Sequence, residues 1–313
     1  MVLLRSIEEL ARIPSPIVLA AGVFDGMHLG HRAVLEAACE SAKRIDATPV
    51  VLTFDPHPAS VLRPNTPVQL LTPQDLKLQL ISQSGIPYTL VVPFDEIFAQ
   101  IEPEDFIELL LKGSMHLSGI CIGEGWRFGR NRKGNPDLLR SIGMRSGFFT
   151  SEVPSVCMNG HTVSSTFIRQ ALTIGDIEKA NRFLGRPFSV SGVVVEGERL
   201  GARIGFPTAN IATDGRQYPA DGVYVIEVST GGNQYQGVAN LGLRPTVTSS
   251  KSRMLEAHIF QFNENLYGVD LEVSFLHRLR PEQRFKGIEA LKERIALDCA
   301  EAIDWLQQNH LPR

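Results

Sequence analysis

Strand-like and helix-like segments alternate through roughly the first 185 residues of the chain. Residues 16–24 (PIVLAAGVF), 49–54 (PVVLTF), 87–94 (PYTLVVPF) and 116–123 (HLSGICIG) are short apolar runs, typical of strands buried on both faces. Helical patterns lie between them, from about Leu29 and over residues 74–83 and 103–112. Such alternation predicts an α/β domain, a parallel sheet with flanking helices.

After residue 185 the spacing of apolar residues changes. They recur at every second position instead of every three or four positions, as in a helix. Val269, Leu271, Val273 and Phe275 occupy every second position, and residues 222–228, 235–241 and 254–262 are also strand-like. Short strands separated by Gly and Pro favour a small antiparallel β-barrel. An apolar stripe then predicts a C-terminal helix: Ile288, Leu291, Ile295, Cys299, Ile303 and Leu306. We therefore expect two domains, residues 1–185 and 186–313.

Charge, cysteine content and the lengths of apolar runs limit the partners and the cellular compartment that we expect for this protein. A net charge of −3 gives no whole-chain reason to expect nucleic acid as a partner. The four cysteines form no CxxC pair, which fits a reducing compartment. The first ten residues contain two glutamates where a signal peptide needs an apolar core, and no apolar run is long enough to span a bilayer. These features predict a cytoplasmic protein without a membrane partner.

Residues 22–31, GVFDGMHLGH, join a buried strand to a helix. In open α/β sheets ligands bind outside the carboxyl ends of strands, and helix N-termini favour phosphate. His28 and His31 are therefore placed to donate hydrogen bonds to a charged phosphoryl group. The alternatives for HxxH alone are chance or half of a metal site, and the strand–glycine–helix context favours the phosphate site.

Two further segments suit phosphate binding. In residues 163–172 a hydroxyl-rich helix start is followed one turn later by Arg169, which shares a helix face with Ser165. An ordinary capped helix with a surface arginine is an equal alternative. In residues 123–135, GEGWRFGRNRKGN, a basic glycine-flanked loop is suited to closing over a triphosphate, although such loops are more often solvated charge runs.

Together these segments resemble the N-terminal nucleotidyltransferase domain of the prokaryotic bifunctional riboflavin kinase/FAD synthetase family. That family has FDGxHxGH, FxPHP, GExFxFG and SSTxIR segments in this order, and all four are present here, the second as TFDPHP at 53–58. Two positions depart from the pattern. Gly125 stands where the family often has Asn or Asp, so a polar side chain is missing there, and Trp126 replaces the usual Phe.

The resemblance implies a Rossmann-like domain that transfers an adenylyl group from ATP to FMN, with Mg²⁺ assisting the departure of pyrophosphate. His28 and His31 would be its catalytic residues. The implied nucleotide contacts are Phe24, Asp25, Gly26, Gly30, Ser164, Ser165, Thr166 and Arg169. Phe54, Pro56 and Phe128 are candidates to line the flavin side, although aromatic residues beside buried strands are more often plain core.

The second part opens with GVVVEGERLGARIGFPTANI, residues 192–211. Gly197, Gly201 and Gly205 make a glycine-rich connection whose backbone amides could cradle phosphates. Thr208 and Asn210 are two residues apart, so on a strand they point the same way and offer the oxygen ligands that Mg²⁺ prefers. A glycine-rich hairpin with a polar strand end is the plain alternative for the glycines alone.

This part resembles the riboflavin kinase domain over nearly its whole length, through the segments PTAN, PADGVY, GVANLGLRPTV, LEAHIF and NLYG. The resemblance implies a six-stranded barrel with a C-terminal helix, and transfer of the ATP γ-phosphoryl group to the ribityl 5′-hydroxyl. It implies that Thr208 and Asn210 bind the magnesium nucleotide and that Glu256 is the catalytic carboxylate. Arg280 and Arg284 are candidates to border the flavin. Gln261 stands where the family often has Asp and receives no role.

We therefore expect a bifunctional enzyme that makes FMN from riboflavin and then FAD, with ATP as co-substrate and Mg²⁺ as cofactor. A kinase with a degenerate first domain is the nearest alternative. A non-catalytic flavin or nucleotide sensor is another, and the presence of the phosphate-binding and acidic residues argues against it. A nucleotidyltransferase for a different substrate fits residues 1–185 taken alone, but the kinase-like second domain would supply FMN.

Overall fold

The computed structural model describes residues 1–66, 68–114, 116–197, 200–213, 215–244 and 252–309. The chain forms two compact units, Met1–Ser165 and Thr166–Arg313. The second unit thus begins ahead of the predicted boundary near residue 185. Asn181 supplies a physical reason, because its amide binds the barrel backbone: Nδ2 donates to the Phe275 carbonyl at 2.8 Å, and Oδ1 accepts from the Phe188 N–H at 2.7 Å.

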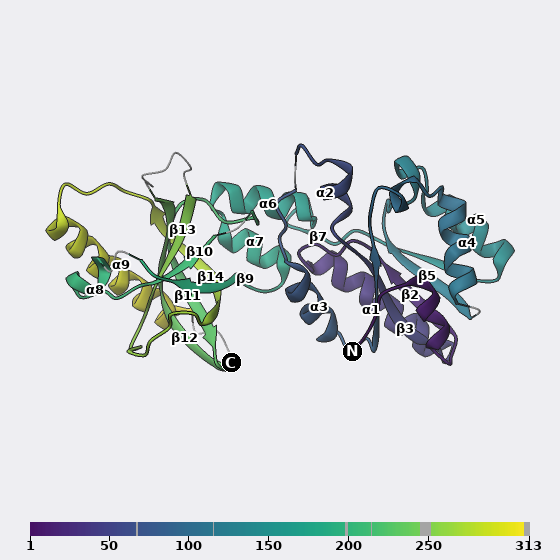
Figure 1. Ribbon diagram of the computed structural model, residues 1–313, viewed down its shortest axis with the longest axis horizontal. Coiled ribbons are helices and arrows are strands. Elements are labelled where there is room, and N and C mark those ends of the chain that lie inside the picture. The colour runs from purple at the N-terminus through teal and green to yellow at the C-terminus, as the bar shows by residue number, and fades with distance from the viewer. Residues whose placement is uncertain (67, 115, 198–199, 214, 245–251, 310–313) are drawn as a thin grey trace. The chain divides into compact units, whose positions relative to one another are not determined.

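The first unit contains a six-stranded sheet in the order β1-β4-β3-β2-β5-β6, with every pairing parallel. Figure 1 labels its strands β2, β3 and β5. The parallel sheet predicted from the sequence is confirmed. Its strands are β1 (Val2–Leu4), β2 (Ile17–Ala21), β3 (Thr48–Asp55), β4 (Tyr88–Pro93), β5 (Leu117–Gly123) and β6 (Phe149–Val153).

Helices cover both faces of this sheet because apolar side chains of β2 point alternately to each side. Ile17 and Leu19 belong to one core cluster, whereas Val18 and Ala20 belong to the other. The helical elements are η1 (Ile7–Arg12), α1 (Leu29–Arg44), α2 (Pro58–Leu62), α3 (Gln74–Ser82), η2 (Phe98–Gln100), α4 (Pro103–Gly113), η3 (Arg130–Arg132) and α5 (Pro136–Ser146), and a short hairpin joins β7 (Cys157–Met158) to β8 (His161–Thr162). Helix α1 packs in one cluster, and α4 and α5 pack in the other.

The strand order defines where a ligand can enter this sheet. After β2 the chain adds β3 and β4 on one side, and later β5 and β6 on the other. In open α/β sheets the crevice forms at such a reversal, outside the carboxyl ends of the strands. Residues 22–31 follow β2 and residues 124–135 follow β5. The fold therefore brings two of the predicted phosphate-binding segments to the same switch point.

The second unit is built on a closed barrel in the order β10-β13-β12-β11-β14-β9, with all pairings antiparallel. The predicted six-stranded barrel with a C-terminal helix is confirmed. Its elements are α6 (Ser165–Ile174), α7 (Ile177–Leu184), β9 (Phe188–Val195), α8 (Leu200–Ile204), β10 (Ala209–Ala212), β11 (Gly222–Thr230), β12 (Asn233–Arg244), β13 (Ser252–Ile259), β14 (Asp270–Pro281) and α9 (Ile288–Gln308). The period-two pattern is also confirmed, since Leu271, Val273 and Phe275 are fully buried.

Two local features differ from the sequence expectations. The glycine-rich connection contains a short helix, α8. The apolar stripe of α9 is only partly buried, because Ile288 and Ile303 are exposed while Ala302 and Leu306 pack against the barrel. The first half of α9 instead contributes Leu291 and Ile295 to the wall of a cavity. Among the described residues, every helix is too short or too polar to cross a lipid bilayer.

Candidate functional site

The turn after β2 has an unusual backbone. Phe24, Gly26 and Met27 all lie in the left-handed region, with φ of 57°, 93° and 43°. The chain reverses within these residues and starts α1, where the Nδ1 atom of His28 accepts a hydrogen bond from the His31 N–H at 3.3 Å. Residues 22–31 will be called the histidine turn. Its backbone places two imidazoles at the N-terminus of a helix, where anions are favoured.

The two imidazoles of the histidine turn are stacked. Their ring centroids lie 3.5 Å apart with an interplanar angle of 18°, and the Phe24 ring meets His31 edge-on at 5.3 Å. Burial lowers the pKa of His31 well below its usual value, and the nearby charges of His28 and Lys77 act in the same direction. His31 is therefore neutral at neutral pH. Its buried Nδ1 atom has no hydrogen-bond partner among the described residues.

Asp25 anchors the histidine turn to the segment before α3. Its buried carboxylate accepts hydrogen bonds from the N–H groups of Leu71 and Thr72 at 3.0 and 3.1 Å. The Gly26 N–H in turn donates to the Thr72 hydroxyl at 3.0 Å. Sequence reasoning missed Leu71 and Thr72, because nothing in the chain marks a partner 46 residues away. These contacts give Asp25 a positioning role within the turn.

The start of α6 also meets the histidine turn. Ser165 donates its hydroxyl hydrogen to the Asp25 carbonyl at 2.8 Å. Gly30 lies close to His28 and to the segment before α6, since a Cβ there would lie 3.2 Å from His28 Cε1 and 3.6 Å from the Val163 carbonyl oxygen. The structure therefore brings Gly30, Ser165 and the imidazoles together. Thr166 and Arg169 follow along α6 and belong to the second compact unit.

The loop after β5 continues a row of aromatic rings. Trp126 stacks on Phe128 at 4.8 Å and 20°. Phe128 then meets Phe106, and the row extends through Phe98 and Phe94 to Phe54 with centroid separations of 5.6 to 6.0 Å. Phe54 and Phe128 are buried members of the core. Pro56 follows Asp55, the last residue of β3.

The basic loop is partly neutralised by one glutamate. Arg130 and Lys133 form ion pairs with Glu102 at 3.3 and 3.5 Å, while Arg127 and Arg132 are exposed. Exposed ion pairs of this kind contribute little to stability. The pairing thus leaves two arginines of the loop available to solvent or to an anionic ligand.

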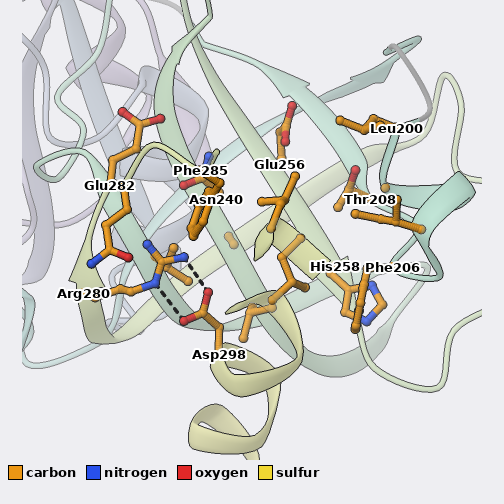
Figure 2. Close-up of a pocket in the computed structure, with 18 of the residues that line it drawn as sticks. Leu200, Phe206, Thr208, Asn240, Glu256, His258, Arg280, Glu282, Phe285 and Asp298 are labelled. Atoms are coloured by element: carbon orange, nitrogen blue, oxygen red, sulfur yellow. Dashed lines mark hydrogen bonds and ion pairs between the residues drawn. The ribbon is translucent and has the colours of Figure 1, made fainter. Parts of the chain in front are cut away.

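The second site is a cavity of about 370 Å³ beside the barrel, between β10, β12, β13, the segment after β14 and α9. Figure 2 shows its polar side chains, which include Thr208, Glu256, Asn240, Arg280 and Asp298, and the apolar ones beside them. A mostly apolar cavity with a few converging polar groups is the usual form of a small-molecule site.

Strand pairing aligns three polar residues along one wall of this cavity. Glu256 on β13 is the direct partner of Asn210 on β10 and of Asn240 on β12. Directly opposed residues have Cβ atoms about 5 Å apart and on the same face. Leu255 and Ala257, the neighbours of Glu256, are buried in the barrel core. Asn240 was missed by sequence reasoning, although it lies within the GVANLG segment.

Asn210 places a buried amide oxygen at the wall of this cavity. The residue is 6% exposed, and its Oδ1 atom has no hydrogen-bond partner among the described residues. Buried polar atoms are nearly always satisfied, so an orphaned one needs an explanation. Thr208 lies two residues earlier and lines the same cavity. The structure therefore brings Thr208, Asn210 and Glu256 together.

The glycine-rich segment packs directly on these two side chains. A Cβ at Gly197 would lie 2.4 Å from Asn210 Nδ2, and one at Gly201 would lie 3.2 Å from Thr208 Oγ1. Gly205 has a φ of 96°, a conformation that favours glycine. The glycines thus allow the backbone to approach the polar wall closely.

Replacing Gly197 by Ala is expected to reduce product formation at the barrel site by about tenfold or more, because the new methyl group must displace the Asn210 amide. A shift of about 1.4 kcal/mol corresponds to tenfold. Gly215→Ala is the matched control, since a Cβ there meets no atom within 4 Å. Steady-state kinetics of both variants checks this. Equal kinetics for Gly197→Ala and the parent would refute the packing argument.

Arg280 and Asp298 form a buried ion pair on the opposite wall of the cavity. Arg280 donates from Nε and a terminal nitrogen to the two Asp298 oxygens at 2.8 and 2.6 Å, and Arg294 adds a contact at 2.9 Å. Asp298 is only 2% exposed. Arg280 therefore lines the cavity, with its charge balanced. Arg284 is exposed and does not line it.

Comparison with known proteins gives one consistent result. The family model of FAD synthetase matches residues 10–167, and that of riboflavin kinase matches residues 184–306. The chain is 37% identical over 300 residues to the bifunctional riboflavin kinase/FMN adenylyltransferase of Escherichia coli (strain K12), covering 95% of this chain and 96% of that protein. It is 36% identical over 294 residues to the protein of the same description from Bacillus subtilis (strain 168), covering 91% of each.

A solved structure described as a macrolide-efflux protein from Streptococcus pneumoniae superimposes with a TM-score of 0.87 at 28% identity, covering 98% of both chains. The whole architecture is therefore found in an experimental structure.

Proposed function

The chain belongs to the bifunctional riboflavin kinase/FMN adenylyltransferase family, and from this we propose which residues perform its two reactions. It is an ATP-dependent enzyme that phosphorylates riboflavin to FMN and then transfers an adenylyl group from ATP to FMN, giving FAD and pyrophosphate. We assign adenylyl transfer to residues 1–185 and the kinase to residues 186–313. The four free thiols suit the cytoplasm, where we place the enzyme.

The kinase assignment depends chiefly on the orphaned Oδ1 of Asn210, which lies opposite Glu256 in a cavity. In the proposed reaction the ribityl 5′-oxygen attacks the γ-phosphorus of ATP, and ADP leaves. Glu256 accepts the hydroxyl proton or orients the hydroxyl for attack. Thr208 and Asn210 hold the nucleotide phosphates, with the backbone of the glycine-rich segment beside them. The apolar side of the cavity, near Arg280, receives the flavin ring.

The oxygen atoms of this site suit a magnesium ion. Thr208 supplies a hydroxyl, Asn210 a buried amide oxygen without a hydrogen-bond partner among the described residues, and Glu256 a carboxylate. Hard oxygen ligands in small number, together with substrate phosphates, are what Mg²⁺ usually takes. When bound, the ion would neutralise charge on the phosphates undergoing transfer. Thr208 and Asn210 are the residues that we propose hold it.

For adenylyl transfer, an oxygen of the FMN phosphate attacks the α-phosphorus of ATP in line, and pyrophosphate departs. The stacked imidazoles of His28 and His31 donate hydrogen bonds to the charge that develops, since His31 is neutral and its Nδ1 has no partner within the part of the chain that the structure describes. Phe24, Asp25, Gly26 and Gly30 shape the turn around the nucleotide. The residues that we propose hold the triphosphate are Ser164, Ser165, Thr166 and Arg169. The catalysis requires positioning and charge stabilisation without a covalent enzyme intermediate.

A product time course tests both assignments. Purified enzyme with riboflavin, ATP and Mg²⁺ is expected to give FMN first and FAD later, and FMN supplied directly is expected to give FAD without a lag. A chelator added in excess over Mg²⁺ should stop FMN formation, and added Mg²⁺ should restore it. Chromatography that shows FMN alone would reduce the protein to a kinase, and FMN formation that survives the chelator would refute the metal assignment.

A further inference from the structure

Lys77 is buried in the first unit, and neither reaction as described uses it. The residue is 6% exposed, and its ammonium donates to Thr53 Oγ1 at 3.4 Å and to the Phe54 carbonyl at 3.1 Å. Both acceptors are neutral. Within the part of the chain that the structure describes, no carboxylate lies within 4.0 Å of this ammonium. Burying an ammonium without an ion-pair partner is costly, so its presence calls for an explanation.

The contacts of Lys77 lead to the histidine turn. Thr53 accepts a hydrogen bond from the Lys77 ammonium and donates its own hydroxyl hydrogen to the Val23 carbonyl at 3.0 Å. The Asp25 carboxylate, also in this turn, accepts hydrogen bonds from the N–H groups of Leu71 and Thr72. These two residues lie just before α3, which begins at Gln74. The α3 segment therefore holds the turn at two points, through Thr72 and through Lys77. Lys77 is the point that carries charge.

The ammonium also acts on the imidazoles through its field. Thr53 and Phe54 stand at the carboxyl end of β3, beside the strand that leads into the turn. The charge of Lys77 contributes to lowering the pKa of His31. Burial lowers the pKa of Lys77 itself to about 8, and Asp55 and Asp25 act against that shift. At neutral pH the side chain is therefore still mostly protonated, and it adds positive potential at His31.

We infer that Lys77 is a positioning residue for adenylyl transfer. Its ammonium holds the histidine turn through Thr53 and provides a fixed positive charge behind His28 and His31, which favours the phosphate groups of ATP and FMN. This inference rests on the proposed placement of adenylyl transfer at the histidine turn. A preorganised charge of this kind stabilises developing negative charge without reorganisation during the reaction.

The first test is Lys77→Met, which removes the charge and keeps an unbranched apolar side chain. FAD formation from FMN is expected to fall at least tenfold, while FMN formation from riboflavin stays within twofold of the parent. Lys112→Met is the matched control, because Lys112 is an exposed lysine of α4 that forms an ion pair with Glu108, one turn away. Both activities of this control should equal those of the parent.

The pH profile separates a charge from mere packing. The charged or titratable groups that face Lys77 are Asp25 from the turn, Asp55 from β3 and His31 from α1, with His28 beside it. For the parent, kcat/KM of adenylyl transfer should decline as the pH rises through about 8, since the free enzyme loses the ammonium proton. Phosphate monoesters are already ionised well below that pH. The decline should be absent in Lys77→Met.

Thermal unfolding gives an independent readout. The folded-state pKa of about 8 is below the ordinary lysine value, so the folded state binds this proton more weakly than the unfolded chain. Stability is therefore lost as the pH falls from about 10 through 8, and a neutral side chain avoids that loss. Lys77→Met should unfold at the parent's temperature or above it. A purely structural lysine would instead leave a less stable protein.

Three results would overturn the inference: FAD formation within twofold of the parent, an alkaline decline that persists in Lys77→Met, or a lowered unfolding temperature that accompanies the loss of activity. Failure of the underlying site assignment has a different signature. In that case substitution of His28 and His31 would leave FAD formation intact, whatever Lys77→Met does.

Discussion

Glu256→Gln is expected to lower the rate of FMN formation by roughly 10²- to 10⁴-fold, the usual contribution of a general base. Glutamine keeps the size of the side chain and its place between Asn210 and Asn240 but cannot accept the hydroxyl proton. The measurement is the initial rate with riboflavin and magnesium ATP at saturation. The rate of FAD formation from supplied FMN should not change, because that reaction is assigned to the other domain.

The matched control for this variant is Glu227→Gln. Glu227 is a half-buried carboxylate on the barrel strand β11, and it does not line the cavity. Its loss should leave FMN formation near the parent value. If Glu256→Gln also kept FMN formation within about threefold of the parent, Glu256 would be a solvent-facing strand carboxylate and the catalytic assignment would fail.

Replacing both His28 and His31 by Ala is expected to lower the rate of FAD formation by about 10²- to 10³-fold or more. Losing one hydrogen-bond donor to a developing oxyanion usually costs that much. FMN formation should stay unchanged. The measurement follows FAD and pyrophosphate from supplied FMN and ATP. His116→Ala, an exposed histidine of the same unit, is the control and should behave as the parent does.

Replacing His28 also affects the stability of the fold, because its side chain caps the N-terminus of α1. Losing an N-cap costs about 1 kcal/mol. The double variant His28→Asn with His31→Gln keeps a capping side chain and polar volume while it removes both imidazoles. It should lose FAD formation to a similar extent and unfold at nearly the parent's temperature. Full FAD formation in this variant would show that the imidazoles are dispensable.

Much of this architecture could be predicted, because periodicity reports local packing. The alternating pattern of Leu271, Val273 and Phe275 directly reflects a barrel interior, and the apolar run that became β2 reflects a sheet covered on both faces. The placement of Thr208, Asn210 and Glu256 in one cavity followed from the strand positions together with the resemblance.

The parts that were missed depend on contacts between distant segments. Thr72 looks like an ordinary loop residue until the Asp25 carboxylate is found beside it, and Lys77 looks like the polar side of a helix until the helix is placed on β3. Asn240 is one polar residue in a strand, and only the register of β12 with β13 puts it next to Glu256. No local pattern encodes these pairings.

The structure has room at Gly125 for the Asn or Asp that the family often has at this position. The residue has a φ of 67°, its N–H donates to Glu152 at 3.1 Å, and a Cβ there would meet no atom within 4 Å. Asn tolerates this backbone conformation better than most residues. The space for a polar side chain is therefore present, and its absence here does not result from crowding.

The two units also differ in how they expose strand edges. The barrel strands close into a ring in which β9 pairs with both β10 and β14, whereas the first sheet ends at β1 and β6. An unpaired edge can recruit a strand from another molecule, and a closed ring offers none. Aggregation during refolding at high protein concentration should therefore begin in the first unit. The barrel should remain unaggregated up to higher protein concentrations.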